Sequence, residues 1–516
     1  MVETATRPSP WIGVAAAAVA LGVTQLAAVA FGPHADSRTA VGSAVIDVTP
    51  GPVKEWAIQS FGTSDKLALS IVVLVVIAVI AAITAQHETR RRPIGSVVIV
   101  MAGVLGCAAV VSRAGASAVD VVPTVVGTVC GVLVLRWLAV GRAPEQTAPA
   151  DSPSSTTDHD PGRRLSLLTF GLIGVGAVAG VAGSLLNRLN SSVAGDRTAF
   201  TLPTPRGAAP PVVPPSVQPA GFTQTPFITP NADFYRIDTA LSVPQVSRAD
   251  WRLRIHGMVD REVTLTFDDL QRFAPVDRIV TLTCVSNPVG GDLISNAKWT
   301  GYRVRDLLAE VGIHPDADMV LSTSVDGFTA GTPVEALTDQ RDALLAIGMN
   351  DAPLPTEHGY PARLVVPGLY GYVSATKWLA DLELTRFDRA EAYWTKLGWS
   401  ARGPIKTESR IDVPRPGAEV PRGATTFGGV AWAQHRGITA VEVRIDDGPW
   451  QPAQLGASYS NDTWRLWSFP WQASAPGSHQ ITVRATDATG TVQTQDEADV
   501  VPDGATGWHS VSFDVA

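Results

Sequence analysis

The chain has 516 residues, a formal net charge of −8 and three cysteines. Its length allows several domains, and the acidic balance, without a Lys/Arg cluster interleaved with aromatic residues, argues against a nucleic-acid partner. Cys284 alone lies outside apolar stretches. A disulfide framework is therefore excluded for the polar part of the chain, and a hydrophobic core must stabilise it.

The first 190 residues are dense in small and branched apolar side chains. We expect residues 1–190 to form a transmembrane bundle, because a bilayer is crossed by about 20 apolar residues in a helix. Five stretches meet this condition: residues 11–31, 67–84, 94–111, 121–140 and 165–186. A buried core helix would explain one of them, but not five in series. None has a mid-span carboxylate or lysine, which argues against a transporter or channel.

The basic connectors predict the orientation of this bundle, because loops rich in Lys and Arg stay in the cytoplasm. Basic side chains follow the second stretch at residues 90–92 and precede the fifth at Arg163 and Arg164. We therefore expect a multi-pass protein of the cell membrane, with everything after residue 187 outside. The arginine pair fits either a twin-arginine export signal, which moves folded proteins, or a plain positive-inside anchor.

The remainder of the chain divides into three parts. Residues 191–230 are rich in Pro and predict a linker. Residues 231–413 mix short strands and helices, which indicates an α+β domain. Residues 414–516 contain regularly spaced β-runs with turn signals between them, which predicts an immunoglobulin-like β-sandwich. The expected strands cover residues 251–257, 263–266, 278–284, 319–323, 362–367, 425–432, 438–445, 463–471 and 479–485, with helices beginning at Phe267 and Arg305.

Cys284 stands where the strand over residues 278–284 breaks into a loop. Such a thiolate is a metal ligand or a nucleophile, and a small buried cysteine is the plain alternative. Three further segments follow it in order: Asn296-Ala297-Lys298-Trp299-Thr300-Gly301, residues 353–368, and Ser374-Ala375-Thr376-Lys377-Trp378-Leu379. Arg363 lies inside an apolar run of the second segment, where an unpaired charge would be costly.

These motifs resemble, in this order, the sulfite oxidase family of molybdenum enzymes over about residues 231–409. The resemblance implies a molybdenum–molybdopterin cofactor with Cys284 as the metal ligand, a catalytic role for Cys284 and Arg236, and a sandwich that pairs two subunits in a homodimer. Arg363 and Lys377 would hold the anionic phosphate end. The implied cofactor contacts are Tyr235, Arg236, Ser324, Asp326, His358, Arg363, Ser374, Thr376 and Lys377.

The resemblance implies oxygen-atom transfer to or from a small, sulfur-containing substrate at the outer face of the membrane. Animal sulfite oxidases continue the cysteine loop with Asn-Arg-Arg, whereas this chain has Asn287-Pro288-Val289, which leaves sulfite itself in question. We expect no haem in this chain, so electrons would be exchanged with a cytochrome or a quinone-linked membrane protein. The alternative is a non-catalytic, membrane-anchored ectodomain that binds a partner through its sandwich.

Overall fold

The computed structural model describes residues 8–61, 65–113, 115–140, 161–205 and 212–516. These residues form two compact units. The first contains the chain up to Ser192 together with Ala240–Ser242, and the second contains Val193–Thr239 and Val243–Ala516.

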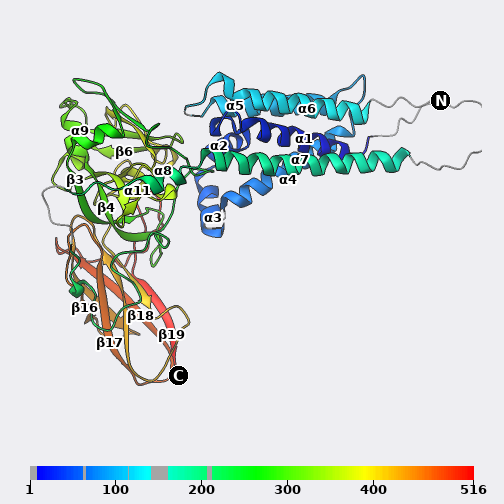
Figure 1. Ribbon diagram of the computed structural model, residues 1–516. Helices are drawn as coiled ribbons and strands as arrows, with labels where there is room; N and C mark the ends of the chain where they lie inside the picture. Colours follow the sequence, from blue (N-terminus) through cyan, green and yellow to red (C-terminus); the bar gives the residue numbers. More distant parts are fainter. Residues whose placement is uncertain (1–7, 62–64, 114, 141–160, 206–211) are drawn as a thin grey trace, which may run out of the picture. The chain divides into compact units, whose positions relative to one another are not determined.

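The first unit is helical, and in Figure 1 its long helices run side by side. Helix α1 packs against α4, α6 and α7. Small residues allow this close approach, since a Cβ on Gly22 would lie 2.3 Å from the carbonyl oxygen of Gly176. The helices are α1 Pro10–Ala28, η1 Pro33–Ala35, α2 Ser37–Val48, α3 Gly51–Phe61, α4 Asp65–Ala85, α5 Ile94–Val111, η3 Ala118–Val121, α6 Val122–Ala139 and α7 Pro161–Ser191.

Five helices in the described part of the chain are long and apolar enough to cross a membrane. They are Pro10–Ala28, Leu67–Ala85, Ile94–Val111, Ala118–Ala139 and Arg164–Ala199. Each corresponds to one of the expected apolar stretches. Helices α2 and α3, in the connector after the first stretch, were not expected. The Asp36 carboxylate accepts the amides of Arg38 and Thr39 and so caps α2.

The second unit begins with an α+β part built on two sheets. One has the strand order β2-β1-β10-β5-β6, and the other has the order β3-β4-β7-β8 with β9 paired to β7. The strands are β1 Arg252–Gly257, β2 Val263–Thr266, β3 Pro275–Thr283, β4 Ile294–Arg303, β5 Met319–Ser324, β6 Thr329–Pro333, β7 Leu344–Met349, β8 Ala352–Pro353, β9 Arg363–Val365 and β10 Leu379–Thr385. The helices are α8 Ala194–Ala199, η4 Pro215–Val217, η5 Asp268–Arg272, α9 Val304–Ala309, α10 Val334–Thr338, η6 Thr356–His358, α11 Gly371–Ser374 and η7 Thr395–Leu397.

Strands appear where the alternating patterns predicted them, but β4, β6, β7 and β10 were not expected. Every residue of β7 is buried, so its sequence lacks the two-residue alternation that marks a half-exposed strand. The turn at Phe267 is a short 3₁₀ helix, η5, rather than the start of an α-helix.

The C-terminal residues form a β-sandwich with the strand orders β11-β13-β17-β16 and β12-β19-β18-β14-β15, in which every pair is antiparallel except the short parallel pair of β12 and β19. Phe427, Trp467 and Phe513 are buried between the sheets. Strand β11 pairs with β13, so the sandwich already includes residues before 414. Its strands are β11 Glu408–Val413, β12 Glu419–Val420, β13 Gly423–Trp432, β14 Ile438–Ile445, β15 Gln451–Pro452, β16 Gln454–Leu455, β17 Arg465–Ala473, β18 Gly477–Asp487 and β19 His509–Val515.

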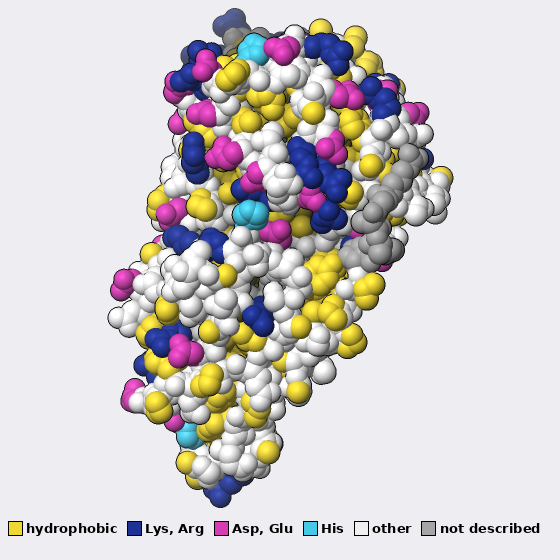
Figure 2. All heavy atoms as spheres, turned by 90° about the vertical axis from the view of Figure 1, so that its left-hand side faces the viewer, with side chains coloured by type: hydrophobic (Ala, Val, Ile, Leu, Met, Phe, Trp, Pro, Cys, Tyr) yellow, Lys and Arg dark blue, Asp and Glu magenta, His cyan; other side chains and the backbone are white. Residues whose placement is uncertain are grey.

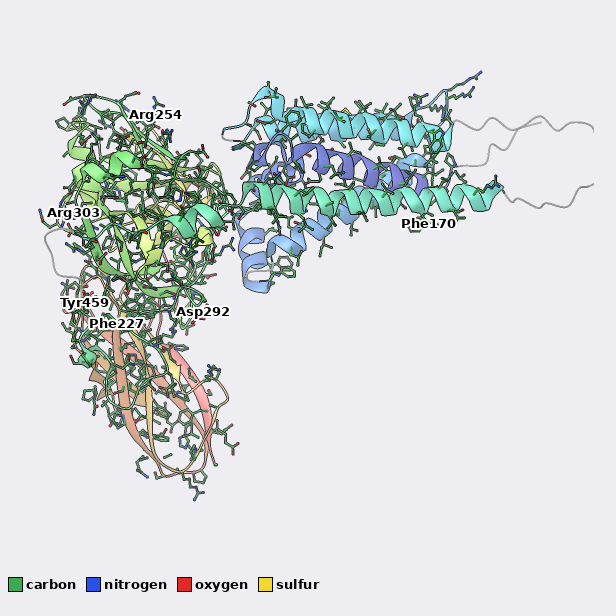
Figure 3. All side chains as sticks on the ribbon, viewed as in Figure 1. Phe170, Phe227, Arg254, Asp292, Arg303 and Tyr459 are labelled. Carbon is green, nitrogen blue, oxygen red and sulfur yellow. The ribbon has the colours of Figure 1, made fainter. Side chains whose placement is uncertain are left out.

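Residues 212–230 of the Pro-rich segment pack against the rest of the second unit. Phe222 and Phe227 are buried. The indole nitrogen of Trp464 donates to the carbonyl of Phe227 at 2.9 Å. The rings of Phe227 and Tyr459, both labelled in Figure 3, lie 5.7 Å apart. This segment therefore covers a join between the α+β part and the sandwich.

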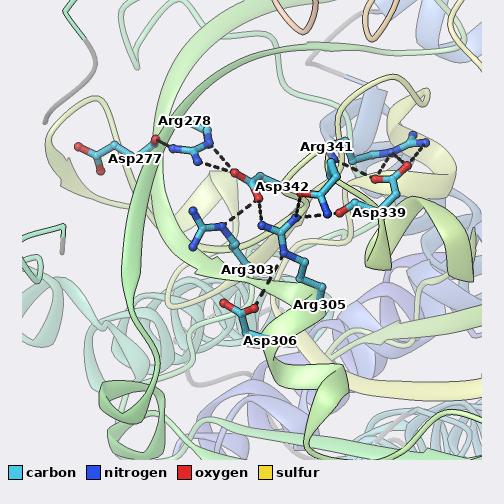
Figure 4. A network of polar contacts seen from close by, with 9 residues as sticks. Asp277, Arg278, Arg303, Arg305, Asp306, Asp339, Arg341 and Asp342 are labelled. Atoms are coloured by element: carbon cyan, nitrogen blue, oxygen red, sulfur yellow. Dashed lines mark hydrogen bonds and ion pairs between the residues drawn. The ribbon is translucent and has the colours of Figure 1, made fainter. Parts of the chain in front are cut away.

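A carboxylate shared by three arginines ties three segments of the α+β part together (Figure 4). Asp342 accepts hydrogen bonds from Arg278 of β3 and from Arg303 of β4, and it pairs with Arg305 of α9 at 2.6 Å. Burial opposes the charge, but the hydrogen bond from Arg278 and the three cations lower the pKa of Asp342. Figure 2 shows the basic and acidic side chains interspersed on this face.

Replacing Asp342 should therefore lower stability. Asp342→Asn leaves the clustered guanidinium groups without their counter-charge, and we expect a loss of about 2 kcal/mol, seen as a lower thermal midpoint. Because the native pKa is lowered, this contribution is present above the ordinary carboxyl pKa and is lost as pH falls through the native value. Asp306→Asn is the control, since the Asp306 side chain is 41% exposed and lies 4.0 Å from Arg305. Equal losses in both variants would contradict the account.

Candidate active site

Cys284 follows directly after β3 and is buried. Its amide donates to the carbonyl of Leu293 at 2.9 Å. The side-chain oxygen of Asn287 accepts the amide of Leu293 at 2.8 Å. Strands β3 and β4 pair up to Thr283 and Ile294. The cysteine thus opens a closed loop at the end of a hairpin, which restricts where its sulfur can lie.

The sandwich supports this loop from its far side. Arg410 donates to the carbonyl of Gly291 at 2.9 Å, and Gln434 donates to the hydroxyl of Thr283 at 2.8 Å. Gly290 has a positive φ of 75° and lies against His509, so any Cβ there would collide with the ring. Burial lowers the pKa of His509 to about 4, so the neutral ring accepts the amide of Ile411.

Tyr235 lies near both Cys284 and Arg363. Its amide donates to the hydroxyl of Ser295 at 3.2 Å, which fixes it beside β4. Burial raises the pKa of the Tyr235 hydroxyl; the charge of Cys284 adds to the rise and that of Arg363 opposes it. Gly371 borders the same space, because a Cβ there would lie 3.8 Å from the Tyr235 oxygen.

Arg363 is a buried cation, only 3% exposed, at the start of β9. Its guanidinium donates to the carbonyl oxygens of His358 and Ala375 at 3.2 Å each and lies 5.1 Å from the centre of the Trp299 ring. Among the described residues no carboxylate pairs with it. Burial lowers its pKa to about 10, so it remains charged at neutral pH. A charge held in this way favours an anionic ligand.

His358 and Lys377 lie next to this guanidinium. Burial, together with the charges of Lys377 and Arg363, lowers the pKa of His358 to about 3. The His358 Nδ1 is buried and has no hydrogen-bond partner within the described residues. Gly359, with a φ of 107°, fits between Lys377 and Arg363, where a Cβ would lie within 3.1 Å of each side chain. The buried ring nitrogen without a partner marks a position where a polar ligand can form a hydrogen bond.

Asp238 partly neutralises the cations. Its carboxylate accepts Lys377 Nζ at 3.0 Å and Arg236 Nε at 2.9 Å. Burial lowers the pKa of Lys377 to about 8, while Asp238 opposes that shift. The Lys377 side chain is 10% exposed, whereas that of Arg236 is 36% exposed. Arg236 is thus the cation of this group most open to solvent.

The other predicted site residues have local partners. Ser374 is buried and donates to the carbonyls of Leu369 and Tyr370. Thr376 shares a 2.7 Å hydrogen bond with Ser322. Ser324 and Asp326 form the β5–β6 turn, whose Val325 amide donates to the carbonyl of Trp378 at 3.0 Å. The Thr376 hydroxyl and the Val325 amide thus hold the chain on either side of Lys377, and the cofactor contacts of Ser324, Asp326, Ser374 and Thr376 stay predictions.

Several residues around the site were not predicted to belong to it. Asp238 is the carboxylate between two cations, and its position two residues after Arg236 was an available signal. Tyr370 is buried, and burial together with the charge of Glu408 raises the pKa of its hydroxyl, with Cys284 among the further causes. Gly359 and Gly371 border the pocket through their missing side chains, which no charge or polarity pattern marks.

The residues therefore fit a polar, anionic group bound beside a thiolate. They provide one soft sulfur ligand in Cys284, a buried cation in Arg363, a second in Lys377 and an unpartnered ring nitrogen in His358. The molybdenum–molybdopterin cofactor has this chemistry: an anionic phosphate end and a metal that accepts thiolate.

Comparison with known proteins agrees. Residues 240–394 match the family model of the oxidoreductase molybdopterin binding domain, and residues 408–483 match that of a bacterial Ig domain. Sulfite oxidase of Gallus gallus is 29% identical over 323 residues, which cover 53% of this chain and 70% of that protein. The uncharacterized oxidoreductase YuiH of Bacillus subtilis (strain 168) is 31% identical over 153 residues, 30% of this chain and 74% of that protein.

Mitochondrial sulfite oxidase of Homo sapiens is 29% identical, and the match covers 48% of this chain and 53% of that protein. The chain thus spans about half the length of the human relative. The crystal structure of the sulfane dehydrogenase SoxCD from Paracoccus pantotrophus aligns with a TM-score of 0.47 at 24% identity, over 58% of this chain and 86% of that chain.

The fold and the site define a molybdopterin-binding oxidoreductase with an Ig-like domain after it. The chain belongs to the sulfite oxidase family of these enzymes, and its cofactor is molybdenum–molybdopterin.

Replacing Arg363 should separate stability from cofactor binding. In cofactor-free protein, Arg363→Met removes an uncompensated buried charge and keeps an apolar stem, so we expect an equal or higher thermal midpoint. The same variant should retain little cofactor. The control is Arg341→Met, because Arg341 already pairs with Asp339 at 2.8 Å and its loss leaves that carboxylate alone. A lower midpoint for Arg363→Met than for Arg341→Met would contradict this interpretation.

Proposed function

We propose that this protein is a membrane-anchored molybdenum enzyme that moves an oxygen atom to or from a small, sulfur-containing substrate. One observation carries the proposal. The buried thiol of Cys284 and the buried guanidinium of Arg363, which meets no carboxylate among the described residues, both lie close enough to the Tyr235 hydroxyl to shift its pKa. A soft metal ligand and an anion-binding cation therefore lie near the same tyrosine.

In this proposal Cys284 holds the metal, and Arg363 and Lys377 hold the anionic end of the cofactor. Bound molybdenum supplies an oxidation-state change together with transfer of an oxygen atom. The neutral His358 ring offers its buried Nδ1 to the cofactor as a hydrogen-bonding group. Tyr235 keeps its proton at neutral pH, because burial raises its pKa, so its hydroxyl is a hydrogen-bond donor.

The substrate side is assigned to Arg236. Its side chain is 36% exposed and already pairs with Asp238 through Nε. The remaining nitrogens can meet an anionic or strongly polar oxygen of the substrate. The sulfite oxidase relatives support a sulfur-containing substrate. The loop after Cys284 contributes Pro288 and Val289 instead of arginines, which favours a less charged substrate than sulfite, such as an S-oxide.

We further propose that the five apolar helices cross the cell membrane and keep the enzyme at its outer face. The lengths and hydropathy of the helices support this, as does the basic connector after α4. Export of the folded, cofactor-loaded domain would need a twin-arginine route, for which Arg163 and Arg164 precede the apolar part of α7. A cytochrome or a quinone-linked membrane protein would exchange the electrons, and the sandwich would pair two subunits.

Cysteine labelling tests this topology. In a chain with Cys107→Ala and Cys130→Ala, the exposed Gln472→Cys of the sandwich should react with a membrane-impermeant maleimide in spheroplasts. Arg91→Cys, in the connector after α4, should react only after lysis. Both residues are exposed, so access depends on the membrane side. The reverse pattern would place the enzyme in the cytoplasm.

The Cys284→Ser variant tests the chemistry. Purified wild-type protein from a host that makes the cofactor should contain molybdenum and pterin in equal amounts. It should also turn over at least one member of a panel of sulfite, sulfoxides and N-oxides with an artificial electron carrier. Cys284→Ser should lose at least 100-fold in turnover, since a hydroxyl is a poor substitute for a soft thiolate ligand.

A matched control for this variant is Cys107→Ser, which lies in α5 outside the second unit and should keep full turnover. Folded wild-type protein that contains neither molybdenum nor pterin would contradict the catalytic assignment. In that case the ectodomain would remain a partner-binding module.

A further inference from the structure

The short helix α8 follows the last apolar helix in the chain, with α7 ending at Ser191 and α8 beginning at Ala194. Val193 is buried in the same hydrophobic cluster as Phe234 and Trp299. The first residues of the second unit therefore share a core with the aromatic side chains that surround Arg363. This segment also precedes residues 240–394, which match the family model.

Asp196 of α8 holds Tyr360. Its carboxylate accepts the Tyr360 hydroxyl at 2.6 Å and pairs with Arg248 at 2.7 Å. Burial opposes the charge, but the hydrogen bonds from Arg248 and Tyr360 lower the pKa of Asp196. Tyr360 is fully buried and stands next to Gly359. The ionised carboxylate thus anchors one end of the segment that carries His358.

Arg197 of α8 holds the other end. Its Nε donates to the carbonyl of Leu354 at 2.7 Å, and its Nη2 donates to the carbonyl of Pro353 at 3.0 Å. One guanidinium thereby binds two successive carbonyl groups. Charge-assisted hydrogen bonds of this kind are stronger than neutral ones and fix direction as well as distance.

The segment between these two ends has little structure of its own. Residues 353–360 contain the end of the two-residue strand β8 and the three-residue helix η6. The same segment supplies His358, and its Glu357 carbonyl accepts Lys377 Nζ at 3.0 Å. Its position therefore depends on contacts with other segments, both at its two ends and at Glu357 and His358.

We propose that α8 is a positioning element of the cofactor pocket: Asp196 and Arg197 fix residues 353–360 and, through them, His358 and Lys377. The inference rests on the proposed function, in which His358 and Lys377 bind the cofactor. Helix α8 comes directly after α7 in the sequence. The helix that holds residues 353–360 is therefore joined to the last of the apolar helices. Disturbing α8 loosens the pocket without touching a residue that lines it.

Cofactor release from the full-length protein in detergent tests this assignment. Asp196→Ala and Tyr360→Phe should each speed the release of molybdenum and pterin about tenfold. The double variant should release them no faster than Asp196→Ala alone, because that single variant already lacks the hydrogen bond to Tyr360. Asp196→Asn keeps an acceptor for the Tyr360 hydroxyl and should recover most of the retention.

Hydrogen exchange in cofactor-free protein is the second measurement. Amides of residues 353–360 should exchange about tenfold faster in Arg197→Ala, while amides of the sandwich stay unchanged. Thr198→Ala is the control, because Thr198 is exposed on the same helix and, among the described residues, its hydroxyl bonds only the carbonyl of Ala194. This readout needs no cofactor, so it tests α8 even if wild-type protein binds no molybdenum, the result that would defeat the proposed function alone.

Three results would overturn the assignment of α8. One is wild-type release and exchange rates in the Asp196 and Arg197 variants. Another is an additive effect in the Asp196–Tyr360 double variant, which would mean that the two residues act separately. The third is faster exchange throughout the second unit, which would mean general destabilisation instead of a loosened segment.

Discussion

The interior of the enzyme part holds a charge that its own side chains do not neutralise. Arg363 is buried over the Trp299 ring, and among the described residues its hydrogen-bond acceptors are carbonyl oxygens. Carbonyl dipoles lower the cost of such a charge only in part, and that cost falls on the cofactor-free protein. An anionic cofactor removes this free-energy cost when it binds, because its charge compensates that of the guanidinium. The low pKa of His358 has a related cause, because burial and the neighbouring cations keep that ring neutral.

The position of the Cys284 thiol depends on contacts between segments that are far apart in the sequence. Cys284 directly follows β3, and the sandwich contacts this strand through Gln434 and the following loop through Arg410 and His509. The sandwich is therefore part of the support of the active site, whatever its role in pairing subunits. The α8 contacts do the same for residues 353–360. Two segments outside the core α+β fold thus support different parts of the site, one at the Cys284 loop and the other at residues 353–360.

Much of this could be predicted from sequence because the signals are local: apolar length for the five helices, alternation for β1, β2, β5 and β14, and ordered motifs for the family. Strand β7 was missed because all its residues are buried, which removes the alternation. Asp238, Tyr370 and Gly371 were missed as site residues because they act through position in the folded chain. The domain boundaries and the contacts of Ser324, Asp326, Ser374 and Thr376 with the cofactor stay predictions.

X-ray absorption at the molybdenum edge tests the central claim most directly, namely that Cys284 sulfur binds the metal of a cofactor held by Arg363. Wild-type and Cys284→Ser protein would be compared at matched molybdenum content. The account predicts that the variant loses one sulfur neighbour of molybdenum while keeping the pterin. An unchanged sulfur shell in the variant would contradict the account, because the metal would then be held without this thiolate.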